Sequence, residues 1–232
     1  MVDLPAPEGE DNTNSTPRRR KPWVSGWEAG SMGASGAAEV RASSAQGWIA
    51  AKSGWIIGVA LVSTASVLLA MGRSAICPCG FVAWWAGDVR SDQNSQQVFD
   101  WYSLTHLVHG LLFYAVGWLM LRQWRWTARL TLAVMLEAGW EVVENSPLVI
   151  DRYRAVTMAF GYSGDSVLNS LSDIGCMAIG FVVARSLPWQ VTVALGVALE
   201  LFALWAIRDN LTLNVLMLAW PIDAVRQWQA AG

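Results

Sequence analysis

The sequence is poor in charge. Of its 232 residues, 15% are Asp, Glu, Lys or Arg and 54% are hydrophobic, and the mean hydropathy is +0.34. Soluble domains carry about 25% charged residues, so this composition excludes an ordinary soluble protein. The net charge of −2, with one basic run at residues 18–21, also argues against nucleic-acid binding. The low charge predicts an integral membrane protein whose partner is the lipid bilayer, with no nucleic acid and with protein partners that the sequence leaves unidentified.

Common catalytic motifs are missing too. The chain has no glycine-rich phosphate loop, no G-x-S-x-G elbow and no H-E-x-x-H helix. Cysteine is scarce, with three residues. We expect Cys176 to be a small buried hydrophobe. For Cys77 and Cys79 two alternatives stay open: a plain or disulfide-bonded loop, which we favour, and soft metal ligands, for which C-x-C is a weak motif.

Five apolar runs are each long enough to cross a membrane as a helix, which takes about 20 residues. They cover residues 53–71, 104–121, 127–145, 166–184 and 189–207. A shorter run at 211–220, stopped by Pro221, predicts an interfacial or re-entrant segment, so five or six spans both fit. The predicted fold class is all-α: a polytopic transmembrane helical bundle of about five spans plus a short C-terminal apolar segment.

The composition divides the chain into three parts. Residues 1–47 are rich in Ser, Gly, Ala and Pro and have few large aliphatic side chains, which predicts a disordered cytoplasmic region. Residues 48–221 form the predicted transmembrane domain, and 222–232 a C-terminal tail. The first span begins too late for an ordinary cleavable signal peptide, so we expect it to remain as an anchor.

Basic residues predict the orientation of the spans. Besides the run at 18–21 and Lys52, they fill the turns after spans two and four, as Arg122, Arg125, Arg129 and Arg185. Cytoplasmic loops carry an excess of Lys and Arg, so the amino terminus is expected inside and the carboxy terminus outside. Arginines in the opposite loops reduce this contrast.

Polar residues gather at one end of four spans. Connectivity alone places the start of span two, the end of span three, the start of span four and the end of span five on the same side. These segments hold His106 and His109; Glu137, Glu141 and Glu144; Asp165, Asn169 and Asp173; and Glu200, Arg208, Asp209 and Asn210. An ionised carboxylate deep in a span costs about 2.5–3.5 kcal/mol on insertion scales. The excess of acid predicts compensation by protons, by loop arginines or by a bound cation.

Two imidazoles beside carboxylates form a ligand set that suits zinc, iron or manganese. In this interpretation the metal ligands are His106, His109, Glu141 and either Asp173 or Asp165, the general base is Glu144, and an anionic head group binds Arg152, Arg154 or Arg208. The corresponding function is metal-dependent hydrolysis or group transfer on a lipid-linked or periplasmic substrate.

Other interpretations of the same residues stay open. Polar side chains between membrane helices also serve as structural hydrogen-bonding groups, and intramembrane carboxylates and histidines also relay protons. A proton-linked transporter would need polar groups through the other half of the helices, where they are few. A non-catalytic scaffold or assembly factor is the remaining alternative, and whether the protein is an enzyme stays undecided at this point.

Long polar signatures run through the chain. Among them are ICPCG at 76–80, THLVHG at 105–110, EAGWEVVENSP at 137–147 and YSGDSVLNS at 162–170. On these residues the chain resembles an uncharacterised family of bacterial inner-membrane proteins with a domain of unknown function, over about residues 53–221. The resemblance implies a multi-pass plasma-membrane protein and supplies no activity. A weaker similarity to VanZ-like membrane proteins implies a helical bundle with an extracytoplasmic polar pocket.

Overall fold

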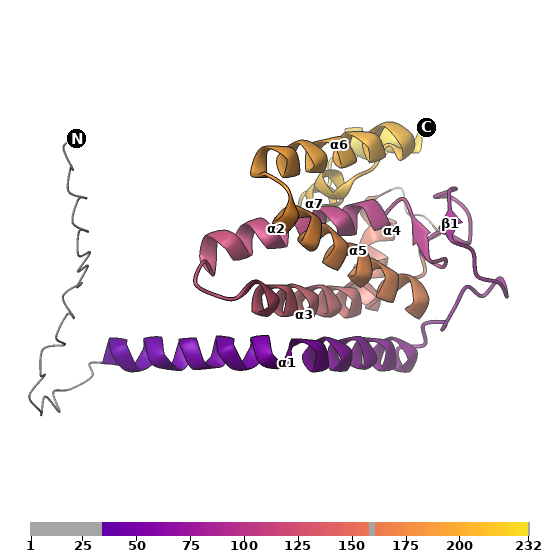
Figure 1. The fold of residues 1–232 in the computed structure, drawn as a ribbon. Helices are drawn as coiled ribbons and strands as arrows, with labels where there is room; N and C mark the ends of the chain where they lie inside the picture. Colours follow the sequence, from indigo (N-terminus) through magenta and orange to yellow (C-terminus); the bar gives the residue numbers. More distant parts are fainter. Residues whose placement is uncertain (1–33, 158–160, 232) are drawn as a thin grey trace, which may run out of the picture.

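The computed structural model describes residues 34–157 and 161–231, with side chains from residue 44 onward, and this part of the chain is mostly helical (Figure 1). The elements, in chain order, are α1 (Ala34–Ala70), β1 (Trp85–Ala86), β2 (Phe99–Asp100), α2 (Ser103–Met120), α3 (Trp126–Glu144), α4 (Pro147–Val156), α5 (Val167–Ser186), α6 (Trp189–Ile207), α7 (Leu211–Ala219) and α8 (Asp223–Ala230). The two short strands pair in parallel within the long loop between α1 and α2.

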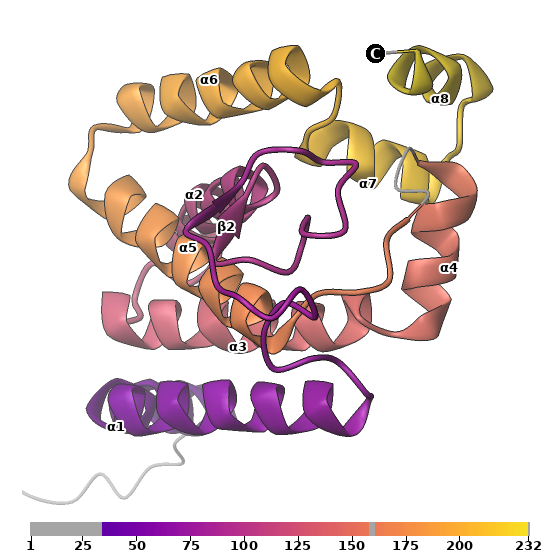
Figure 2. The same cartoon turned by 90° about the vertical axis from the view of Figure 1, so that its right-hand side faces the viewer.

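The long helices form successive layers. Figure 2 shows α1 beside α3, then the crossed pair α2 and α5, and α6 beyond them. Phe181 and Met177 of α5 are fully buried and pack on small residues of α3, chiefly Ala133, Val134 and Ala138. This core fixes α3 and α5 next to each other, and both helices carry acidic residues towards one end.

Two glycines allow α2 and α5 to cross closely. A Cβ atom at Gly110 would collide with the backbone of Met177 and Phe181, and one at Gly180 would collide with the carbonyl oxygen of Leu107. Small residues at such crossings let helix backbones approach. The crossing lies one helical turn from His106, so it brings the imidazole of α2 close to the polar start of α5.

Four helices in the described part of the chain are long and apolar enough to cross a membrane: Ser44–Ala70, α2, α5 and α6. The remaining predicted span, 127–145, coincides with α3, which has 19 residues but carries Arg129 and three glutamates. Because α3 carries these charges, it is not among the four helices, and the number of membrane spans stays a prediction. The short predicted segment at 211–220 is the helix α7, which ends before Pro221.

Two parts of the chain differ from expectation. α1 begins at Ala34, so residues 34–47, predicted to be disordered, are helical; this stretch is rich in Ala, the strongest helix former. The rest of that region, residues 1–33, lies outside the described residues. The helix α4 was not predicted at all. Ser146 caps it, and Pro147 occupies its first turn, where the missing N–H is not needed.

Candidate functional site

A polar cavity of about 50 Å³ lies where α2, α3, α4, α5, α7 and the loops before α2 and α5 meet. Its lining is made of Asn94, Ser95, Tyr102, His106, Glu144, Tyr153, Tyr162, Asp165, Asn169, Asp173 and Asn214. No Lys or Arg is among these residues. The space is large enough for a few water molecules or an ion.

Both histidines of the chain converge on one carboxylate. His106 and His109 lie three residues apart on one face of α2, and their Nδ1 atoms lie 2.6 Å and 2.9 Å from Oε1 of Glu137 on α3. Glu137 is fully buried, and its other oxygen, Oε2, has no hydrogen-bond partner in the described part of the chain. The three ligand atoms lie within 4.8 Å of one another, a spacing at which they could hold a metal ion.

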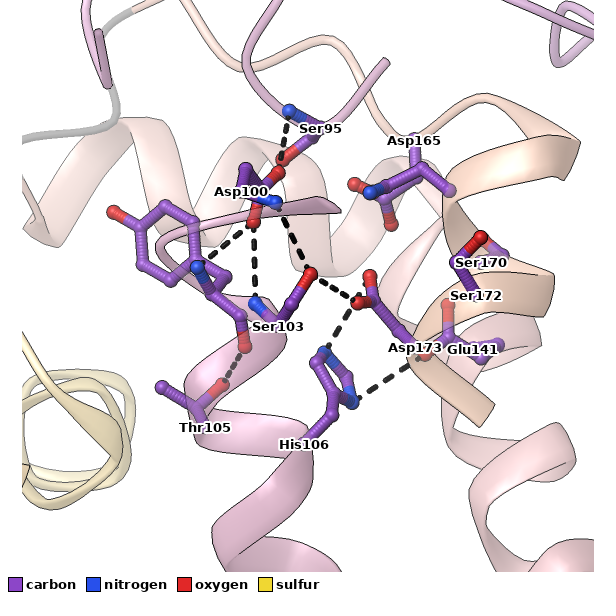
Figure 3. Close-up of polar contacts among 12 residues, drawn as sticks. Ser95, Asp100, Ser103, Thr105, His106, Glu141, Asp165, Ser170, Ser172 and Asp173 are labelled. Carbon is purple, nitrogen blue, oxygen red and sulfur yellow. Dashed lines mark hydrogen bonds and ion pairs between the residues drawn. The ribbon is translucent and has the colours of Figure 1, made fainter. Parts of the chain in front are cut away.

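The far side of the His106 ring faces α5. Its Nε2 atom lies 3.8 Å from Oδ2 of Asp173, and the hydroxyl of Ser103 donates to Oδ1 of the same carboxylate at 2.9 Å (Figure 3). The Ser103 hydroxyl also accepts a hydrogen bond from the backbone N–H of Asp100. A chain of contacts therefore fixes Asp173 against the imidazole.

Asp100 fastens the preceding loop to the start of α2. Its carboxylate accepts the backbone N–H groups of Ser95, Tyr102 and Ser103 at 2.8–3.2 Å. Burial raises the pKa of Asp100, and these three donors only partly offset that effect. Ser95 has φ of 61°, an uncommon value for a residue other than glycine, and its bond to Asp100 holds this conformation beside the cavity.

Asp165, just before α5, is held on two sides. Asn145 donates to its Oδ2 atom at 2.8 Å, and the hydroxyl of Tyr162 lies 3.0 Å from both carboxylate oxygens. Burial, and to a lesser extent the nearby Asp100 carboxylate, raise the pKa of Asp165 to about 6 against these stabilising hydrogen bonds. Asp165 therefore changes protonation near neutral pH.

Glu141 and Glu144 continue the acidic face of α3. Oε1 of Glu141 lies 3.7 Å from Nδ1 of His106, is buried and has no hydrogen-bond partner among the described residues. His106, Glu141 and Glu144 form a second set of atoms with metal-ligand spacing. The two sets share His106, so a single ion would use one of them.

The structure does not bring the three predicted anion-binding arginines to the cavity. Instead Arg152 donates to the Leu218 carbonyl, Arg154 to the Tyr162 carbonyl and Arg208 to the Trp228 carbonyl. Each arginine thus joins two segments of backbone.

Glu200 also lies away from the cavity. It accepts the N–H groups of Leu211 and Thr212 and so caps α7.

The loop with Cys77 and Cys79 is disulfide-bonded, as the favoured alternative predicted. Cys77 and Cys79 form a disulfide, so neither offers a thiolate to a metal, and Cys176 is buried in α5. The disulfide loop is tied to the site because Gln97, fully buried, donates to Sγ of Cys79, and Asn169 of the cavity donates to the Gln97 carbonyl.

Several site residues were not assigned a role from sequence. The sequence showed Glu137 only as one of the glutamates on one face of α3, and Glu141 was the expected partner of the histidines. In the structure Glu137 contacts both histidines. Asp100 lies just before α2, where an Asp side chain commonly accepts backbone N–H groups that follow it, and this pattern could have revealed Asp100. The tyrosines of the cavity carry no such signal.

The charges around the two imidazoles do not balance. Six carboxylates surround them: Asp100, Glu137, Glu141, Glu144, Asp165 and Asp173. Two protonated imidazoles would neutralise only two of these, and an unpaired buried charge costs several kcal/mol. The site therefore requires additional protons or a bound cation.

No solved structure matches this chain. Among curated proteins it is similar to UPF0314 proteins of Sphingopyxis alaskensis (56% identical, covering 78% of this chain and 97% of that protein), Novosphingobium aromaticivorans (56%, 76% and 90%) and Rhizobium meliloti (51%, 76% and 90%). The family model described as protein of unknown function (DUF2585) matches residues 68–231. The polar site and the helices from α2 to α8 thus lie within the matched region, and the chain belongs to this uncharacterised bacterial family.

Proposed function

We propose that this protein binds a divalent transition metal through His106, His109 and Glu137 and uses it for hydrolysis or group transfer at a membrane. The observation that carries the proposal is the convergence of two imidazole nitrogens on one buried carboxylate whose second oxygen has no partner. Two nitrogen ligands and one oxygen ligand match the sets that hold catalytic zinc with an open position for water.

The surroundings of His106 support this assignment. Metal-binding histidines usually present the other ring nitrogen to a carboxylate, which fixes the ring and strengthens the ligand. Asp173 lies on that side of His106, and Ser103 fixes Asp173 in turn. The ring is thus supported on its Nε2 side and has Nδ1 directed at Glu137.

Structural hydrogen bonding alone explains less of the site. Polar side chains that only hold helices together are expected to satisfy one another, because each unpaired buried polar atom costs about 1–3 kcal/mol. Here two carboxylate oxygens, Oε2 of Glu137 and Oε1 of Glu141, have no partner among the described residues. A cation in this position would satisfy them.

The chain supplies the groups that hydrolysis needs. A divalent metal held by His106, His109 and Glu137 would polarise the scissile group and activate water. Glu144 lines the cavity, accepts the proton of the attacking water and returns it to the leaving group. Tyr153 has its pKa raised by burial and by the neighbouring Glu144 carboxylate, so it stays protonated and keeps Glu144 in place. Asp165 also lines the cavity, and its pKa of about 6 lets it exchange a proton near neutral pH.

We further propose that α3 is a fifth span of a multi-pass inner-membrane protein, with a cytoplasmic amino terminus and a periplasmic carboxy terminus. Its acidic residues Glu137 and Glu141 are buried, while Met135, Leu136 and Val143 are exposed and apolar, as expected for lipid contact. Alkaline phosphatase fused to the carboxy terminus would be active in this topology and inactive in the inverse one.

Metal analysis tests the functional proposal. The full chain is purified in detergent without chelators, and bound metals are measured by mass spectrometry for the wild type, His109→Ala and Glu137→Gln. Glu200→Gln is the matched control, because Glu200 lies on α6 away from the cavity and Gln retains one of the two acceptors that cap α7. Helix content and thermal unfolding are recorded for every sample.

We expect close to one metal per wild-type chain, lost in His109→Ala and Glu137→Gln and retained in Glu200→Gln. Less than about a tenth of an equivalent in the folded wild type, after incubation with zinc, iron or manganese, would exclude a metal site. Ser103→Ala sharpens the result, since loss of support for Asp173 should weaken metal affinity about tenfold without abolishing it.

A further inference from the structure

We infer that the substrate is an amphiphile with a long hydrocarbon chain, and that this chain lies in an apolar groove that opens from the histidine site. This inference rests on the proposed function, because it names the substrate class of the same metal site.

The groove has a volume of about 400 Å³ and runs between α2, α3 and α7. Its apolar walls are Phe113 of α2, Leu136 and Trp140 of α3, and Leu211, Val215 and Leu218 of α7. Leu136 and Val215 are 54% and 58% exposed, so their side chains are available to a ligand. The volume falls within the range of small-molecule sites.

The groove and the polar cavity are continuous. Five residues line both: Tyr102, His106, Glu144, Tyr153 and Asn214. His109 and Glu137, the other two proposed metal ligands, line the groove. A chain in the groove therefore places the attached head group against the metal ligands and Glu144.

Polarity changes stepwise along the α2 wall. There the lining passes from Thr105 and His106 through His109 to Phe113, one turn at a time, whereas on α3 Glu144 and Glu137 alternate with Trp140 and Leu136. The hydroxyl of Thr105 already donates to the Tyr102 carbonyl, so it offers no free donor. A bound peptide would need partners for its backbone along the apolar part, whereas a hydrocarbon chain needs none.

The opposite side of the cavity is polar. A pocket of about 470 Å³ shares Asn94, Tyr102 and Tyr162 with the cavity, and Ser91, Asp92 and Gln96 also line it. The reacting centre thus has an apolar pocket on one side and a polar pocket on the other. An amphiphile matches this division, with its chain on one side and its head group or the attacking water on the other.

Photocrosslinking tests the groove. The probe is a lysophosphatidylcholine that carries a diazirine near the end of its acyl chain, added to the full chain in detergent, and the modified residues are mapped by mass spectrometry. Val215→Trp and, independently, Leu136→Trp fill the groove from opposite walls. Val193→Trp is the matched control, because Val193 on α6 is 56% exposed and does not line the groove.

We expect labelling concentrated on the peptides of α3 and α7 and lowered about tenfold by either groove variant, the loss expected when a few methylene groups are displaced. Val193→Trp should leave it unchanged, and all three variants should retain the metal.

Labelling spread over α1 and α6 with no enrichment in the groove, or unaffected by both groove variants, would overturn the inference even if metal is bound. Groove labelling in a protein that binds no metal would instead support chain binding and overturn the metal proposal. The two failures are thus distinguishable.

Discussion

The two ends of the α2, α3 and α5 helices satisfy their charges in different ways. At one end, carboxylates and imidazoles are buried together around a cavity. At the other end, arginines lie over aromatic rings: Arg122 over Trp118 at 4.5 Å, Arg129 over Tyr114 at 5.7 Å and Arg185 over Trp126 at 4.4 Å. No Asp or Glu occurs in residues 113–136 or 174–199, so this basic end has no carboxylate partner in these segments.

The difference shows why one end points to a ligand more strongly than the other. Aromatic faces stabilise these guanidinium groups, and the exposed Arg122 and Arg185 reach towards water on flexible stems. Two nitrogens of Arg129, Nε and Nη1, are buried and have no hydrogen-bond partner among the described residues. A buried carboxylate repels the aromatic face and needs donors, protons or a cation. The acidic end lacks enough donors of its own. We therefore expect metal binding at the acidic end and, at the basic end, only an electrostatic response to anionic lipid.

The largest effect should come from breaking the crossing that supports the acidic end. Gly110→Ala places a methyl group against the backbone of α5, and backbone cannot move aside as a side chain can. We expect the free energy of unfolding to fall by about 3 kcal/mol and metal occupancy to fall with it. Gly139→Ala on α3, which has no neighbour within 4 Å of the added atom, is the control. Equal stability of both variants by thermal unfolding in detergent would contradict the close crossing.

An intermediate effect is expected from pH at the acidic end. Burial raises the pKa of Asp209 to about 6, although Asn210 and Tyr102 donate to its carboxylate. Because the folded state holds the proton more tightly, stability is present below about pH 4 and declines as pH rises to about 6, by roughly 2–3 kcal/mol. Asp209→Asn should remove this part of the pH dependence.

Unfolding free energy measured from pH 4 to pH 8 provides the comparison. Asp151→Asn, which alters an exposed carboxyl, should keep the wild-type slope. A wild-type slope in Asp209→Asn would show that other groups produce the dependence.

The smallest effect belongs to the basic end. Anionic lipid should stabilise the protein relative to zwitterionic lipid, and Arg129→Gln should reduce that gain by about 1 kcal/mol without changing metal content. Arg154→Gln, on α4 near the acidic end, is the control and should leave the lipid response unchanged. Thermal unfolding in bilayer discs with and without phosphatidylglycerol measures both variants. Metal loss in Arg129→Gln would mean that the two ends are not independent.

The fold could be read from the sequence where hydrophobic runs are long. The runs at 104–121, 166–184 and 189–207 coincide with α2, α5 and α6, because about 20 apolar residues are sufficient to specify such a helix. The helical residues 34–47 and the helix α4 escaped prediction, since Ala-rich and Pro-initiated segments also occur in irregular structure. Hydrophobicity alone does not distinguish a helix from irregular structure in such segments.

The site was predictable only in part. Spacing on α2 and α3 placed His106, His109 and the glutamates on facing stripes, and the structure does bring them together. Spacing cannot say which glutamate meets the imidazoles, because that depends on the axial shift between two helices, and Glu137 rather than Glu141 takes the closest position. Positive charge predicted that Arg152, Arg154 or Arg208 binds an anionic group at the cavity. Their long side chains donate to backbone carbonyls instead.

X-ray absorption spectroscopy of the metal-loaded protein tests the central claim most directly. For zinc, we predict backscattering from two imidazoles with nitrogen at about 2.0–2.1 Å, together with oxygen ligands, in the wild type, and no metal with imidazole ligands in His109→Ala. A spectrum with oxygen ligands alone, identical in wild type and His109→Ala, would show that the metal is held elsewhere and would contradict a metal centre at His106, His109 and Glu137.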